Sequence, residues 1–268
     1  MSHPIQSAAL SSGVTLPYVE QGDPAGVPVV LLHGYSDSWR SWELLLAELP
    51  DAVHAYAITQ RGHGDADRPT DGYQPHDLAN DTVAFMDAVG IQAAVIAGHS
   101  GGSYTAQRFA IDHPHRTLGL VLIGALHTLQ DNAGVEELWD AVSELADPVD
   151  PQFVRAFQEG TTTRPVPAEF LEAVIAESQK LPARVWKAAL RGLLDATPPT
   201  TTGRIAAPSL ILWGEDDQLA SRGNQDALAA AIDDVRTVVY ERTGHAPHWE
   251  RPEQVAAELA AFSASIAG

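Results

Sequence analysis

The stretch GHSGG at residues 98–102 fits the pattern G-x-S-x-G and lies between two segments of different character. The apolar run AAVIA at residues 93–97 is typical of a buried strand, whereas SYTAQRFA at residues 103–110 suits a helix. In that setting the pattern predicts a tight, strained turn that holds a serine hydroxyl clear of a sheet. The outer glycines are needed because side chains there would collide with neighbouring backbone. Ser100 is therefore a candidate nucleophile.

A serine hydroxyl is a weak nucleophile, so this interpretation requires a base, an acid that orients the base, and donors for an oxyanion. Downstream, an apolar run at residues 208–213 leads into GEDD, and a second run at residues 235–240 leads into GHAPHWE. Upstream, VVLL at residues 29–32 leads into HGY. In open α/β sheets, ligands bind beyond the carboxyl ends of the strands, so we expect these three segments to meet beside the serine.

The order serine, carboxylate, histidine along the chain is the one that this turn pattern requires. The residue types alone leave both Asp216 and Asp217 open as the acid. For the base, the glycine before His245 and the Glu-Arg-Pro that follows it favour His245 over His248.

Together these motifs resemble those of the α/β-hydrolase superfamily, in particular its capped branch of esterases and lactonases, and the resemblance spans nearly the whole chain. It implies that Ser100 is the nucleophile and His245 the general base. The family's G-x-x-D motif implies Asp217 as the orienting acid, and the family's oxyanion hole implies the backbone N–H groups of Tyr35 and Gly101. The matching segments are HGY at 33–35, RGHG at 61–64, GHSGG at 98–102, GEDD at 214–217, GH at 244–245 and ERP at 250–252.

The resemblance implies cleavage of a small, uncharged carboxylic ester or lactone through an acyl-enzyme on Ser100. Hydrolysis of a carbon–carbon bond is an alternative. Relatives with that activity often carry Asn before the serine and Trp after the histidine, whereas this chain has His99 and Ala246, which makes the alternative less favoured. Dehalogenases and epoxide hydrolases of this fold use an aspartate nucleophile, which a serine at this turn excludes. A slow-turnover receptor for a small ligand with an intact triad is a third hypothesis, because fold and triad do not fix function.

With 268 residues, of which 45% are hydrophobic and 19% charged, the chain suits one large globular domain, and the resemblance implies that this is a single α/β-hydrolase domain. Alternating strand-like and helix-like segments predict a mostly parallel central sheet flanked by helices. The alternation breaks at residues 127–202, where four amphipathic segments predict a helical cap inserted into a core of residues 1–126 and 203–268. Predicted strands cover 5–10 and 14–19 (a hairpin), 29–32, 53–59, 93–97, 118–123, 210–213 and 235–240, and predicted core helices cover 39–49, 76–89, 100–112, 222–231 and 252–267.

The formal net charge of −19 argues against binding to nucleic acid or to anionic membranes. The first residues lack the features of a signal peptide, and no run reaches the roughly 18 apolar residues of a membrane span, so we expect a cytoplasmic protein that acts on a small molecule. Cysteine is absent and no H-E-x-x-H spacing occurs, so we expect neither a metal nor a cofactor. His33, His63 and His99 are interpreted as structural. One residue departs from the resemblance, because relatives often have Asp before RGHG where this chain has Gln60.

Overall fold

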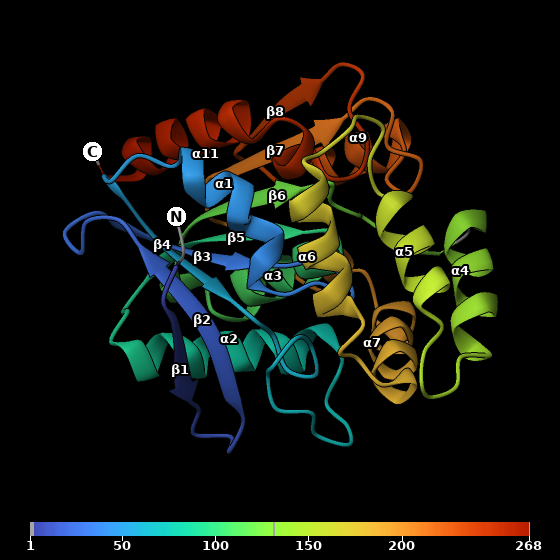
Figure 1. Cartoon of the computed structure of the whole chain (residues 1–268). Coiled ribbons are helices and arrows are strands. Elements are labelled where there is room, and N and C mark those ends of the chain that lie inside the picture. Colours follow the sequence, from blue (N-terminus) through green and yellow to red (C-terminus); the bar gives the residue numbers. More distant parts are fainter. Residues whose placement is uncertain (1–2, 131, 268) are drawn as a thin grey trace.

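The computed structural model describes residues 3–130 and 132–267 of the chain. At its centre is an eight-stranded sheet in the order β1-β2-β4-β3-β5-β6-β7-β8 (Figure 1). β2 runs antiparallel to β1 and to β4, and the strands from β4 to β8 in this order are parallel. The predicted hairpin and the mostly parallel sheet are confirmed. The strands are β1 Ile5–Ala9, β2 Thr15–Gln21, β3 Val27–Leu32, β4 Val53–Ile58, β5 Ala94–His99, β6 Thr117–Ile123, β7 Ser209–Gly214 and β8 Val235–Tyr240.

The inner strands are buried on both faces of the sheet. Successive residues of a strand point to opposite faces, and in β5 Ile96 packs into one hydrophobic cluster while Val95 packs into the other. The same alternation occurs in β6, where Leu122 and Val121 belong to the two different clusters. A parallel sheet with helices on both faces needs such continuously apolar strands, because neither face meets water.

Helices on both sides cover these clusters. α2 (Pro75–Val89), α3 (Gly101–Asp112) and α9 (Arg222–Ala230) pack on one face, and α1 (Glu43–Glu48) and α11 (Pro252–Ala267) pack on the other. Figure 1 shows α1 and α11 together on the side away from α2. The predicted helix at 39–49 is divided in two. A 3-10 turn, η1 (Trp39–Trp42), precedes α1, and the Ser38 hydroxyl caps this turn by accepting from the N–H of Arg40.

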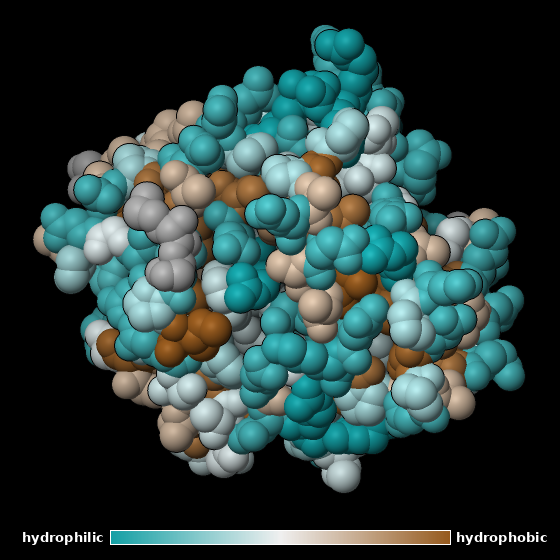
Figure 2. Space-filling view, viewed as in Figure 1, coloured by the Kyte–Doolittle hydropathy of each residue, from teal (hydrophilic) through white to brown (hydrophobic). Residues whose placement is uncertain are grey.

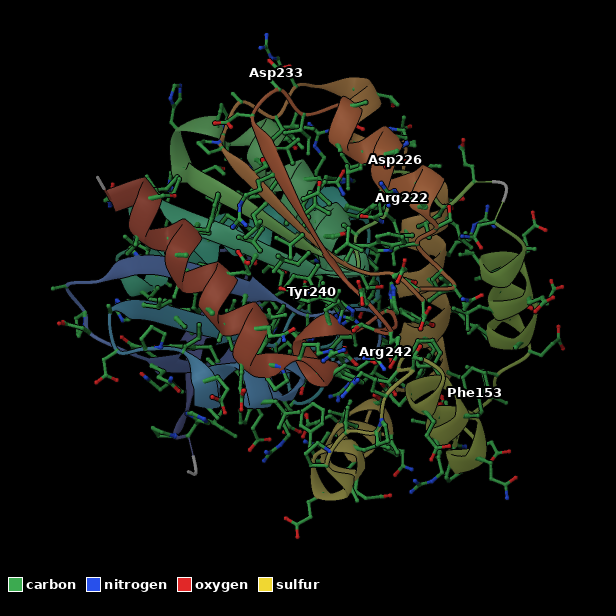
Figure 3. The ribbon with its side chains drawn as sticks, turned by 90° about the horizontal axis from the view of Figure 1, so that it is seen from above. Phe153, Arg222, Asp226, Asp233, Tyr240 and Arg242 are labelled. Atoms are coloured by element: carbon green, nitrogen blue, oxygen red, sulfur yellow. The ribbon has the colours of Figure 1, made fainter. Side chains whose placement is uncertain are left out.

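The segment between β6 and β7 is helical, and residues 127–202 are named the helical insertion below. It contains α4 (Ala133–Ser143), α5 (Pro151–Glu159), α6 (Ala168–Ser178), α7 (Ala183–Asp195) and the short α8 (Pro199–Thr202). The first four match the predicted amphipathic segments, and α8 lies in a polar run where the sequence predicts no helix. In Figure 1 the insertion lies beyond the carboxyl ends of the parallel strands. It has a hydrophobic cluster of its own around Trp186, whose ring centroid lies 5.5 Å from that of Phe153, labelled in Figure 3.

The face of the molecule seen in Figure 2 is mainly hydrophilic, with hydrophobic side chains in scattered patches between polar ones. Many surface charges are paired. Arg222 and Asp226, for example, both project from α9 in Figure 3, with Nε and Oδ1 2.9 Å apart. Among the described residues, no helix combines the length and the apolar character needed to cross a membrane.

Candidate active site

Ser100 lies at the turn between β5 and α3. Its backbone has φ +51° and ψ −120°, a conformation that a residue with a side chain keeps only where the surrounding structure enforces it. A Cβ on Gly98 would collide with the carbonyl oxygen of Gly102, and a Cβ on Gly102 would collide with the carbonyl oxygens of Leu32 and His33. The two glycines thus let strand and helix backbone approach closely enough to hold the strained turn.

His245 and Asp217 reach Ser100 from the loops that follow β8 and β7. His245 Nε2 lies 2.8 Å from Ser100 Oγ, and His245 Nδ1 lies 2.8 Å from Asp217 Oδ2. An ionised carboxylate only accepts hydrogen bonds, so Nδ1 carries the proton and Nε2 is free to accept from the serine hydroxyl. Asp217 Oδ1 accepts from the backbone N–H groups of Leu219 and Ala220, both at 2.9 Å. The structure therefore brings together the three side chains that the sequence singles out.

The two neighbouring candidates have other partners. Asp216 is partly exposed, and its N–H donates to the carbonyl oxygen of Thr243 at 2.9 Å. His248 is buried, and its Nε2 donates to Ser41 Oγ at 3.2 Å. The contacts to the serine and to the imidazole thus belong to His245 and Asp217.

The surroundings of His245 and Asp217 shift their pKa values in opposite directions. Burial lowers the pKa of His245, but the charge and hydrogen bond of Asp217, with the charge of Asp37, outweigh it and raise the pKa above 6.5. Burial raises the pKa of Asp217, but His245 and the two backbone N–H donors outweigh it and bring the pKa below 3.8. The site is therefore suited to hold a positive charge on the imidazole next to an ionised carboxylate.

The backbone groups of Tyr35 and Gly101 lie close together. Gly101 is the first residue of α3, so its N–H has no acceptor within the helix. A Cβ on Gly101 would lie 3.5 Å from Tyr35 N. The side chain of Tyr35 fixes this loop against the insertion, because its hydroxyl donates to the carbonyl oxygen of Trp186 at 2.7 Å.

His99 and His63 are buried and bonded to backbone. His99 Nε2 donates to the carbonyl oxygen of His245 at 3.0 Å, and His63 Nδ1 donates to that of Arg61 at 2.9 Å. Burial lowers the pKa of His99 to about 3 and that of His63 to about 4, so both rings are neutral at pH 7. Within residues 3–130 and 132–267, no group of three or more His, Cys, Asp or Glu side chains is arranged to hold a metal ion.

Gln60 braces the loop after β4 through His33. The Gln60 side-chain amide donates to the carbonyl oxygen of His33 at 2.9 Å, and the Gln60 backbone N–H donates to His33 Nε2 at 3.0 Å. The two bonds hold His33 at the end of β3, directly before the loop of Tyr35. Gln60 thus links the loop after β4 to His33, at the position where the resemblance implies an aspartate.

A second carboxylate, Asp37, lies beside the site although the sequence motifs do not reveal it. Its Oδ1 accepts from Gln158 Nε2 at 2.9 Å and its Oδ2 accepts from Ser41 Oγ at 3.1 Å. Burial raises its pKa to about 6, although these two hydrogen bonds and the charge of His245 act in the opposite direction. Asp37 is therefore mainly ionised at neutral pH. The one signal in the sequence is its place two residues after the HGY segment.

The helical insertion also holds the loop that carries His245. The N–H of His245 donates to the carbonyl oxygen of Thr161 at 3.0 Å. Glu250 accepts from the N–H of Gly244 through Oε1 and from the N–H of Arg164 through Oε2, both at 2.8 Å. The insertion and the loop thus form one hydrogen-bonded unit.

A pocket adjoins Ser100 and His245 and is named the Ser100 pocket. Residues of α4, α5 and α7 form part of its wall, and Asp37, Gln158 and Thr161 are polar residues at its surface. Its apolar lining consists of Leu126, Leu129, Val135, Leu138, Phe157, Leu190, Leu193, Leu219 and Trp249.

A mostly parallel eight-stranded sheet with a strained serine turn after β5 defines the α/β-hydrolase fold. Residues 29–258 match the model of the alpha/beta hydrolase family, and the chain belongs to this family.

Individual relatives differ in their chemistry. Epoxide hydrolase 3 of Xenopus tropicalis is 31% identical over 118 residues, which are 43% of this chain and 32% of that protein, so the match spans about a third of that relative's length. A 2-hydroxy-6-oxononadienedioate/2-hydroxy-6-oxononatrienedioate hydrolase of Comamonas testosteroni is 28% identical over 193 residues, which are 65% of this chain and 64% of that protein. The esterase RhEst1 from Rhodococcus sp. ECU1013 superposes with a TM-score of 0.86 at 26% identity and covers 98% of this chain and 99% of that structure.

Proposed function

We propose that the protein is a serine hydrolase that cleaves small, uncharged carboxylic esters or lactones. The observation that carries this proposal is the continuous hydrogen-bonded chain from Ser100 Oγ through His245 to Asp217, with 2.8 Å at each step, beside a pocket lined mainly by apolar side chains. The likeness to the esterase RhEst1 over nearly the whole chain supports it. Ser100, at the turn between β5 and α3, has no carboxylate, whereas an epoxide-opening mechanism of this fold requires a carboxylate nucleophile.

In this mechanism His245 Nε2 takes the proton of Ser100 as Oγ attacks the carbonyl carbon. Asp217 holds the imidazole tautomer and stabilises the imidazolium. The backbone N–H groups of Tyr35 and Gly101 donate to the tetrahedral oxyanion, a contribution of about 3–4 kcal/mol per donor in other enzymes. His245 then protonates the leaving alcohol, and water activated by the same histidine hydrolyses the acyl-enzyme.

We further propose that the chain is a single domain in which residues 127–202 act as a cap. Val135, Leu138 and Leu190, from α4 and α7, line the Ser100 pocket from the side of the insertion. Apolar side chains over a reacting carbonyl exclude water and strengthen the electrostatic interactions within the site.

The charge of the pocket wall supports an uncharged substrate. Among the described residues that line the Ser100 pocket, none is Lys or Arg, and Asp37 contributes a negative charge. Two insertion arginines that could have pointed inward have other partners. Arg184 donates to the carbonyl oxygens of Arg68 and Pro69, and Arg191 pairs with Asp195. A dianionic substrate such as the dienedioate named for the Comamonas relative would meet no cation here, so carbon–carbon bond hydrolysis is the weaker candidate.

An ester series tests this function. We expect kcat/KM for 4-nitrophenyl esters to rise from the acetate and to fall before the dodecanoate, because burial of apolar area contributes roughly 25 cal/mol per Å² until the pocket is full. The 4-nitrophenyl monoester of succinate should be poorer than the butanoate. A serine-directed phosphonate should add one adduct, which peptide mass mapping places on Ser100. A preference for the succinate or for the longest chain, or an adduct at another residue, would contradict the proposal.

The pH dependence of kcat/KM should show that the charges of Asp217 and Asp37 raise the pKa of His245. The base acts when it is neutral, so activity falls as pH drops through its raised pKa, and the acidic limb should have its midpoint above 6.5. Replacing Asp37 with Asn removes one negative charge near the imidazole and should move this midpoint to lower pH. Asp226→Asn, on exposed α9, is the matched charge control. An unmoved limb in Asp37→Asn, or an equal shift in both variants, would show that Asp37 does not act on His245.

A further inference from the structure

Gln158 is a glutamine of α5 that is fully buried and lines the Ser100 pocket. Its side-chain nitrogen is well satisfied. Nε2 lies 2.9 Å from Asp37 Oδ1, 2.8 Å from Ser178 Oγ and 3.3 Å from Ser36 Oγ. These contacts link three segments of the protein, the loop after β3, α5 and α6.

The orientation of this amide follows from its partners. Asp37 is mainly ionised at neutral pH, and an ionised carboxylate only accepts hydrogen bonds, so the amide presents its NH₂ group to Asp37 Oδ1. Oε1 is then on the other side of the amide, and it is a buried atom without a hydrogen-bond partner among the described residues. Buried polar atoms are nearly always paired, because leaving an acceptor without a donor is costly. An orphan acceptor on a residue that lines the pocket therefore points to a ligand that supplies the donor.

The rest of the pocket sharpens this requirement. Most of its lining is apolar, and its other side-chain charge away from the triad is the carboxylate of Asp37. Thr161, another polar residue of the lining, uses its hydroxyl to donate to the carbonyl oxygen of Gln158 at 2.7 Å. This end of the pocket thus offers acceptors and a negative charge, which favour a hydroxyl or N–H group and disfavour a carboxylate.

We infer that Gln158 determines substrate specificity: its Oε1 accepts a hydrogen bond from a hydroxyl group of the substrate, so the enzyme prefers hydroxylated esters to esters in which a methyl group replaces that hydroxyl. The inference rests on the proposed ester hydrolysis and names the substrate class of the same pocket. It accounts for a buried polar atom of the pocket wall that the proposed mechanism leaves unused.

Pairs of esters that differ only in OH against CH₃ test the inference. On the acyl side, the pairs are 4-nitrophenyl 3-hydroxybutanoate with 3-methylbutanoate, and 4-nitrophenyl 6-hydroxyhexanoate with heptanoate. On the alcohol side, the pair is 2-hydroxyethyl butanoate with propyl butanoate, and their hydrolysis is measured by the release of acid. For each pair, the ratio of the two kcat/KM values is divided by the ratio of the two rates of alkaline hydrolysis, which corrects for the difference in intrinsic reactivity between the esters. We expect the wild type to prefer the hydroxylated member about tenfold or more in at least one pair.

Three variants separate the acceptor from the structural role of the side chain. Gln158→Met removes Oε1 and should bring the ratio close to one. Gln158→Glu also keeps an acceptor oxygen. Its carboxyl group meets the negative charge of Asp37, so one of the two groups holds a proton and donates it to the other, and the variant should retain the preference. Gln152→Met is the matched control, because Gln152 is exposed on the same helix, and it should behave as wild type. A general loss of activity would lower both members of a pair and leave their ratio unchanged.

Wild-type ratios near one in all three pairs would overturn the inference and would mean that water alone satisfies Oε1. A preference that survives in Gln158→Met would overturn it as well. If a Gln158 variant does not fold, as judged by circular dichroism, the wild-type ratios decide alone. Failure of the wild type to hydrolyse either member of any pair would instead contradict the proposed ester hydrolysis, so the two failures are distinct.

Discussion

Replacement of Ser100 by alanine should lower kcat for a 4-nitrophenyl ester by about 10⁶-fold, the scale on which loss of the nucleophile acts in other serine hydrolases. The reason is that, in the proposed mechanism, Oγ forms the acyl-enzyme after it loses its proton to His245 Nε2, which lies 2.8 Å away. Steady-state kinetics with active-site titration measures the effect. Ser103→Ala is the matched control, because Ser103 is buried in the first turn of α3 and its replacement should keep activity within about tenfold. Residual activity of Ser100→Ala within 100-fold of wild type would rule out this nucleophile.

The second large effect concerns the acid. Asp217→Asn should lower kcat by about 10⁴-fold, because an amide can donate to Nδ1 and then holds the wrong imidazole tautomer. Asp216→Asn should stay within about tenfold, because Asp216 is partly exposed and its backbone, rather than its side chain, bonds to Thr243. Kinetics of both variants at pH 8, with circular dichroism to check folding, provides the comparison. The opposite ranking would assign the role of the acid to Asp216.

Much of the fold could be predicted because it depends on local pattern. Runs that are apolar throughout, such as residues 29–32 and 118–123, predict strands covered on both faces, and the structure contains them as β3 and β6. The order of the strands in the sheet does not follow from such runs. β3 lies between β4 and β5, and this placement depends on packing between segments that are distant in the chain.

The candidate site shows the same difference between residues that a local sequence pattern reveals and residues that only the folded chain reveals. Ser100 and His245 belong to short motifs whose glycines reflect local backbone needs, so the sequence reveals them. Asp216 and Asp217 are adjacent residues of the same type, so residue type alone does not identify the acid. The resemblance favours Asp217, and in the structure it is the Asp217 side chain that contacts His245. Gln158 gives no signal. It lies on an amphipathic helix beside Phe157, and its burial depends on Asp37, which is 121 residues away in sequence.

The hydrogen bonds between residues 161–164 and the His245 loop bear on how such a protein could be recombined. By position in the chain, this short stretch belongs to the insertion, yet its backbone supports the loop of His245, the proposed base. A chimera that exchanged residues 127–202 would keep these bonds to the N–H of His245 and to Glu250 only if the new backbone followed the same path at residues 161–164. Residues 161–164 therefore belong structurally with the core, although they lie within the insertion in sequence. An exchange of the insertion that is designed to change the substrate range should leave Thr161 to Arg164 in place.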